Sequence, residues 1–340
     1  MKKLFIILTL AGVISACNGN TSKEEEKPTS RVESVAKKLV DYISSRNRHD
    51  EIVAEDSKCV NPFIYERRET LSIEGIGGGN VPVVIMSRCC EHPIFKPDYI
   101  VNDGAVGQYK IYHCNELNML KEDSSLVKFL ELSYSEFRDD YVPYLAQDVV
   151  LILKTSHING LAEQRAFFHA LLSRGIKNPV IIKRSYDDSE IEDLQIKAGA
   201  DFGQFFIDGL GDGIWIDAPN VDSSSVLSLS FGILQGSRVR ISKTEYISCP
   251  SCGRTLFDLQ TTIARIKEKT SHLKNLKIGI MGCIVNGPGE MADADYGYVG
   301  SAKGMVNLYK GQTCVEKLIP EEQAVDKLIE LIKENGDWID

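Results

Sequence analysis

The sequence predicts an α/β protein with two folded regions. Three observations support this: strand-like and helix-like segments alternate between residues 149 and 234, 340 residues suffice for two ordinary domains, and an amphipathic helix follows Pro320 near the end of the chain. Strands that alternate with helices at this spacing form parallel β/α units. The pattern alone leaves open whether these units form layers or a partial barrel.

The first residues are similar to a bacterial lipoprotein signal. Lys2 and Lys3 precede an apolar run over 4–13, which is too short to span a bilayer, and small residues lead into Cys17. We therefore predict a signal segment over 1–17, with Cys17 as the lipidated residue that would hold the chain at a membrane. A buried N-terminal strand or helix is the alternative. Residues 18–30 are polar and charged and predict a linker.

The first folded region is expected over 31–242. Apolar runs and helical periodicity predict strands at 81–86, 127–132, 149–153, 180–182, 205–207 and 214–216, and helices at 35–43, 161–172, 189–198 and 225–234.

The second folded region is expected over 243–340 as a small α+β unit. It has a predicted helix at 258–267 and a predicted strand at 276–281. Its C-terminal helix begins at Pro320 and carries the apolar stripe Val325, Leu328, Ile329 and Ile332.

Composition excludes some classes of function. Hydrophobic residues make up 43% of the chain and charged residues 26%, which is typical of a soluble globular protein. The formal net charge of −9 argues against a general nucleic-acid binder, which would carry a basic surface. A few local cations would still suffice to bind a phosphate-bearing small molecule.

The second region carries the clearest chemical motif. Cys249 and Cys252 lie two residues apart, and Cys283 follows the predicted strand 276–281, where a loop can meet the first pair. Glu290 lies on the same glycine-rich loop as Cys283. Three thiols and one carboxylate suit an iron–sulfur cluster, because an oxygen ligand is more exchangeable than a thiolate and leaves one iron open to substrate. Spacing alone favours structural zinc equally, and a redox Cys-x-x-Cys pair is a weaker alternative.

The residues around this motif resemble one enzyme family. The matching segments are Glu245-Tyr246-Ile247-Ser248-Cys249-Pro250-Ser251-Cys252-Gly253-Arg254-Thr255 and Gly279-Ile280-Met281-Gly282-Cys283-Ile284-Val285-Asn286-Gly287-Pro288-Gly289-Glu290. They are similar to 4-hydroxy-3-methylbut-2-enyl diphosphate synthase, in its large form with an N-terminal TIM barrel, an inserted barrel-like domain and a C-terminal cluster domain. Looser matches occur at 194–201 and 208–213.

The resemblance implies a degenerate, barrel-like parallel β/α domain followed by an iron–sulfur domain. It implies a [4Fe–4S] cluster held by Cys249, Cys252, Cys283 and Glu290, with Glu290 as the ligand that substrate displaces. The implied reaction is the reductive conversion of 2-C-methyl-D-erythritol 2,4-cyclodiphosphate in non-mevalonate isoprenoid synthesis, with ferredoxin or flavodoxin as electron donor.

The sequence departs from the family at its start. Residues 1–30 have no counterpart of the TIM barrel, so we expect a chain that carries the insert and cluster domains alone. The resemblance implies a cytoplasmic protein, whereas a functional signal at Cys17 would place it at the cell envelope. The alternative function is a non-catalytic metal- or cluster-binding protein, exported and lipid-anchored.

For the other candidate groups, the sequence favours a structural role over metal binding, phosphate binding or contact with substrate. They are the possible second metal set Cys89, Cys90, His92, His113 and Cys114, the glycine-rich turn 77–80, the acidic pair Asp293 and Asp295, the histidines His157 and His169, and Asn286 between two predicted ligands.

Overall fold

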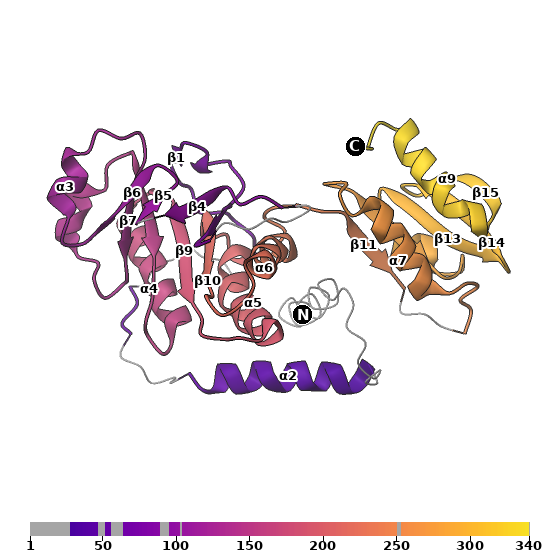
Figure 1. The fold of residues 1–340 in the computed structure, drawn as a ribbon, viewed down its shortest axis with the longest axis horizontal. Coiled ribbons are helices and arrows are strands. Elements are labelled where there is room, and N and C mark those ends of the chain that lie inside the picture. The colour runs from indigo at the N-terminus through magenta and orange to yellow at the C-terminus, as the bar shows by residue number, and fades with distance from the viewer. Residues whose placement is uncertain are drawn as a thin grey trace. The chain divides into compact units, whose positions relative to one another are not determined.

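The computed structural model divides the chain into two compact units, Met1–Arg240 and Ile241–Asp340. It describes residues 28–46, 52–55, 64–88, 95–102, 104–249 and 253–339. Each unit is described by itself (Figure 1). None of the helices in these described ranges is long and apolar enough to cross a membrane.

The first unit is built around a closed eight-stranded barrel. Its strands are β3 (Val83–Met86), β4 (Tyr99–Asn102), β5 (Ala105–Val106), β6 (Tyr109–His113), β7 (Lys128–Leu132), β8 (Val149–Leu153), β9 (Val180–Ser185) and β10 (Gly213–Asp217). The strand order is β10-β3-β4-β5-β6-β7-β8-β9, with β10 closing on β9. The structure thus confirms the predicted α/β barrel-like domain and removes the choice between layers and barrel.

Most of the barrel is parallel, as predicted, but one part is not. The short strand β5 pairs antiparallel with both β4 and β6. All other neighbours in the barrel pair in parallel. The barrel is therefore mixed, and its irregular part lies in a segment for which the sequence predicted no element.

Alternating residues of the barrel strands form two separate cores. Val84, Leu130 and Ile182 pack in a core that also contains helix residues such as Phe167. Their neighbours along the strands, such as Phe129, pack in a second core without helix residues. Because side chains alternate across a strand, the second core fills the barrel interior.

Helices cover part of the outer face of this barrel (Figure 1). The described helices of this unit are α2 (Pro28–Ser44), α3 (Leu117–Glu122), α4 (Gly160–Ser173), α5 (Ile191–Ile207) and α6 (Ser223–Gly236), together with the 3-10 helix η1 (Asp139–Tyr144). Of these, α2 packs on α5. A small antiparallel pair, β1 (Ser72–Ile73) and β2 (Ile76–Gly77), precedes β3. The Asn159 and Asp222 side chains cap α4 and α6 by accepting backbone N–H bonds, which fixes where these helices begin.

The strand predicted at 205–207 is wrong, because these residues form the last turn of α5. Phe202, Phe205 and Phe206 are all buried and follow Leu194 and Ala198 at helical spacing. A short apolar run cannot be distinguished by its length from the end of a buried helix.

The second unit is a five-stranded mixed sheet with helices. Its elements are β11 (Glu245–Ser248), α7 (Leu259–Thr270), β12 (Lys277–Met281), α8 (Gly287–Glu290), β13 (Tyr296–Ala302), β14 (Met305–Lys310), β15 (Thr313–Pro320) and α9 (Glu321–Glu334). β11, β12 and β13 are parallel, and β13, β14 and β15 are antiparallel. The predicted α7, β12 and α9 are confirmed, and the apolar stripe of α9 packs into the core against β12, β13 and β14.

Candidate metal centre

Two of the predicted ligands lie at one edge of the second unit's sheet. Cys249 follows the last residue of β11, and Cys283 lies two residues beyond the end of β12. β11 and β12 are parallel neighbours in which Ser248 pairs with Ile280. The two thiols therefore lie at the carboxyl ends of adjacent strands, although they are far apart in sequence.

A direct contact joins the two ligand segments. The Gly282 backbone N–H donates a hydrogen bond to the Cys249 sulfur at 3.3 Å. Peptide N–H groups that point at ligating sulfur are a feature of iron–sulfur sites, where they stabilise negative charge on sulfur.

The turn at Gly282 leaves no space for a side chain. A Cβ there would lie 2.7 Å from the Thr255 methyl group, and one at Gly300 would lie 2.5 Å from the Gly282 carbonyl oxygen. The close approach of β13 and of the segment after β11 therefore requires glycine at both positions. The Leu256 N–H also donates to the Gly282 carbonyl at 3.0 Å, which ties these segments together.

The predicted ligands and the loop between them differ in their exposure to solvent. Cys249 and Cys283 are half-buried, whereas Asn286 and Glu290 are exposed. The Glu290 carboxylate lies at the end of the one-turn helix α8, whose backbone N–H groups at Gly289 and Glu290 donate to the Asn286 carbonyl. Asn286 thus shapes the loop through its backbone, and its side chain makes no capping bond.

The donors present fit a cluster of iron and sulfide. They comprise two thiols at neighbouring strand ends and a carboxylate that solvent reaches. One of the two sulfurs also accepts a backbone N–H. Within the described ranges, no three His, Cys, Asp or Glu side chains gather closely enough to hold a metal ion. Cys252 lies outside those ranges, so the four-ligand set stays a prediction.

Other predicted positions also lie outside the described residues. They are Cys17 with the rest of the signal-like segment, and Cys89, Cys90 and His92 of the weaker metal set. Of the acidic pair, Asp295 accepts the Lys277 N–H at 2.7 Å and Asp293 pairs with the Lys277 ammonium at 3.2 Å. This pair therefore stabilises the start of β12, in keeping with a structural role.

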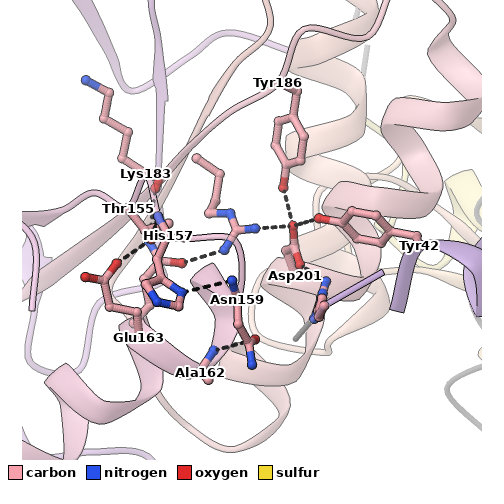
Figure 2. Close-up of polar contacts among 12 residues, drawn as sticks. Tyr42, Thr155, His157, Asn159, Ala162, Glu163, Lys183, Tyr186 and Asp201 are labelled. Atoms are coloured by element: carbon pink, nitrogen blue, oxygen red, sulfur yellow. Dashed lines mark hydrogen bonds and ion pairs between the residues drawn. The ribbon is translucent and has the colours of Figure 1, made fainter. Parts of the chain in front are cut away.

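In the barrel unit, the structure reveals a buried acidic centre that the sequence analysis did not single out. Asp201 of α5 accepts bonds from Tyr42 of α2 at 2.6 Å and from Tyr186 at 3.0 Å (Figure 2). Arg184 of β9 donates to the same carboxylate at 2.7 Å, and Arg46 forms a further ion pair with it. Burial beside Asp201 raises the pKa of Tyr186 well above its ordinary value, so this hydroxyl stays a donor.

A second polar chain beside it fixes the loop after β8 (Figure 2). The Thr155 hydroxyl donates to Glu163 and accepts the His157 N–H, and His157 Nδ1 accepts the Asn159 N–H at 2.9 Å. His157 is therefore engaged in the loop that begins α4, as the structural interpretation predicted.

The two looser matches noted in the sequence each contain one buried acid of the barrel unit. Asp201 ends the segment 194–201, and Asp212 lies in the segment 208–213. Asp212 accepts bonds from the Val180 N–H, Arg67 and Thr70 at the start of β9 and β10.

Comparison with known proteins agrees with this arrangement. Residues 245–334 match the family described as GcpE protein C-terminal domain. The chain is 48% identical over 333 residues to the 4-hydroxy-3-methylbut-2-en-1-yl diphosphate synthase (flavodoxin) of Phocaeicola vulgatus, an alignment covering 89% of this chain and 54% of that protein.

Two further relatives carry similar names. The flavodoxin enzyme of Porphyromonas gingivalis is 47% identical over 311 residues, covering 89% of this chain and 52% of that protein. The chloroplastic ferredoxin enzyme of Oryza sativa subsp. japonica is 53% identical over 177 residues, covering 52% of this chain and 24% of that protein. The chain spans about half the length of the bacterial relatives just named. The chain is therefore a partial homologue of 4-hydroxy-3-methylbut-2-en-1-yl diphosphate synthase, and its cysteine-bearing unit matches the GcpE protein C-terminal domain.

Proposed function

We propose that the second unit holds a [4Fe–4S] cluster through Cys249, Cys252, Cys283 and Glu290. The observation that carries this proposal is the Gly282 N–H on the Cys249 sulfur, at an edge where the carboxyl ends of β11 and β12 meet. Such a cluster would supply low-potential electrons and a Lewis-acidic iron.

The same proposal assigns the chain to the reduction of 2-C-methyl-D-erythritol 2,4-cyclodiphosphate to 4-hydroxy-3-methylbut-2-enyl diphosphate. Flavodoxin or ferredoxin would be the electron donor, as the relatives' names state for those proteins. The exposed carboxylate of Glu290 supports this role, because a ligand that solvent reaches is also one that a substrate oxygen reaches. The half-buried cysteines would hold the cluster in place.

Metal content tests the first part. After anaerobic reconstitution the full chain should be brown and contain iron and sulfide in equal amounts. Cys249→Ser and Cys283→Ser should each lower the iron content, and Glu290→Ala should lower it less because three thiols remain. Cys314→Ser is the matched control, since Cys314 is also a half-buried free thiol of this unit. A colourless protein with one zinc ion would contradict the cluster and favour the non-catalytic alternative.

Turnover tests the second part. The reconstituted chain should be assayed with the cyclodiphosphate and reduced flavodoxin, alone and with a separately produced N-terminal half of the Phocaeicola vulgatus relative. We expect product only when that half is added, because the match covers 54% of the relative. Product from neither mixture, with a fully loaded cluster, would overturn the assignment to this reaction.

A further inference from the structure

We propose that the ligand-bearing edge of the second unit is a docking surface for the acidic face of a one-electron carrier protein. The surface comprises Arg254, Ile284, Val285, Lys303 and Met305. This inference rests on the proposed function, and it adds the location and chemistry of the donor's contact.

Topology brings these residues to one end of the sheet. β12 and β13 are parallel, so the turn after β13, which contains Lys303, lies at the same end as the Cys283 loop. Gly300 of β13 packs against the Gly282 carbonyl, so close that a Cβ would lie 2.5 Å away. Arg254 follows β11, whose carboxyl end also lies there.

The loop after Cys283 exposes apolar side chains directly beside a predicted ligand. Ile284 is 42% exposed and Val285 is 60% exposed, and Met305 in the neighbouring turn is 36% exposed. Exposed apolar side chains gathered at a functional edge indicate an interaction site. A carrier that docks here would contact the residues directly after Cys283 and would therefore lie beside the proposed cluster.

The charged side chains at this edge favour an acidic partner. Arg254 and Lys303 are exposed, and neither forms an ion pair with another described residue. Asp258 is already engaged, because it caps α7 by accepting from Thr261. Glu290 is a proposed ligand, and Glu321 is half-buried in the first turn of α9. Glu322 in the same turn is exposed, but it follows β15, the strand at the far edge of the sheet from β11 and β12. Both charges on the surface defined above are therefore positive.

Electron-transfer complexes are small and weak, so charge steering largely determines their rate of formation. The test measures how fast reduced flavodoxin bleaches the visible absorbance of the reconstituted full chain in a stopped-flow instrument. Reduced methyl viologen serves as a small reductant that needs no docking surface.

We expect Arg254→Glu combined with Lys303→Glu to slow reduction by flavodoxin about 10-fold at low salt, with the difference disappearing at high salt. Lys303→Glu alone should show part of this effect, and Val285→Ser should slow the reaction at both salt concentrations. Lys274→Glu is the matched control, since Lys274 is exposed before β12 at the opposite end of the sheet. Reduction by methyl viologen should stay unchanged in all variants.

The outcomes separate the two proposals. A chain that binds no cluster, or whose cluster methyl viologen cannot reduce, would overturn the proposed function itself. A loaded chain that methyl viologen reduces normally, but whose reaction with flavodoxin is insensitive to the charge reversals or equally sensitive to Lys274→Glu, would overturn the docking surface alone.

Discussion

The Gly282 N–H donates to the Cys249 sulfur, so the residue before one predicted ligand contacts the sulfur of another. This contact links the carboxyl ends of β11 and β12. It orients one thiol, as outer-shell hydrogen bonds do in metal sites.

Replacing Gly282 should therefore weaken cluster binding. In Gly282→Ala the new methyl group would lie 2.7 Å from the Thr255 side chain, so Thr255 and the turn must separate, which draws the N–H away from the Cys249 sulfur. We expect iron affinity to fall about 10-fold, as it does when outer-shell partners are lost. The measurement is iron retained during titration with a chelator. Gly289→Ala, at a site with no neighbouring atom within 4 Å, should retain iron like the parent chain.

Asp201 should be essential for the stability of the barrel unit. Asp201→Asn leaves Arg184 and Arg46 buried beside a neutral amide, which should lower the free energy of unfolding by about 3–5 kcal/mol. Urea unfolding followed by Trp215 fluorescence, in a Trp338→Phe background, reports on this unit. Asp193→Asn breaks only an exposed pair with Lys38 and should cost less than about 1 kcal/mol. If both variants lost the same free energy of unfolding, burial of the Asp201 centre would add nothing to the stability of the unit.

Tyr298 should make the second unit sensitive to alkali. Burial raises the pKa of Tyr298 to about 12. The unfolded chain loses this proton near pH 10, before the folded chain does, so the free energy of unfolding should fall as the pH rises from about 10 to 12. Unfolding of the unit can be followed by Trp338 in a Trp215→Phe background. Tyr298→Phe should reduce this alkaline loss.

The same variant should also stabilise the unit at neutral pH. The Tyr298 hydroxyl is buried without a hydrogen-bond partner among the described residues, so its removal should stabilise the unit by about 1 kcal/mol. Tyr296→Phe is the matched comparison, because the Tyr296 hydroxyl donates to Asp337 at 2.6 Å and its loss should destabilise. A destabilised Tyr298→Phe would indicate that its hydroxyl has a partner in solution.

Gly209 should tolerate no side chain. Its φ is +75°, and a Cβ would lie 2.2 Å from the Glu66 carbonyl oxygen. Gly175 has a similar φ of +65° but open space around it. Gly175→Ala should cost about 1 kcal/mol from the backbone conformation alone, and Gly209→Ala about 3 kcal/mol or more from the added clash. Thermal unfolding of both variants separates the two effects, and equal shifts in melting temperature would contradict the close contact.

The sequence predicted best those elements whose burial is uniform. β8 was predicted over 149–153 and occupies those residues, because all five are apolar and buried on both faces. β13 was missed, although its first five residues are also buried. Gly297 and Gly300 weaken its strand pattern, and they are present because Met291 and the Gly282 carbonyl pack where side chains would extend.

The residues of the candidate sites also divide into those that a local sequence pattern predicts and those that it does not. The position of Cys283 just past a strand followed from a clear apolar run, and the structure confirms it. The Asp201 centre could not be predicted in this way, because Tyr42 lies 159 positions from its partner and no local pattern reports such a distance. The ion pair between Arg184 of β9 and Asp201 likewise depends on how the strands and helices of the barrel unit pack together.

The closed barrel has a consequence for the order of folding. β10 is the last strand of the barrel to be synthesised, and it pairs with β3, the first, as well as with β9. Until Asp217 has left the ribosome, both β3 and β9 remain unpaired edges, which are the sites where partly folded chains associate. The three cysteines predicted as ligands follow α6, so the barrel can complete itself before Cys249 emerges. During synthesis the unit that carries the predicted ligands would therefore fold after a domain that has already closed its own edges.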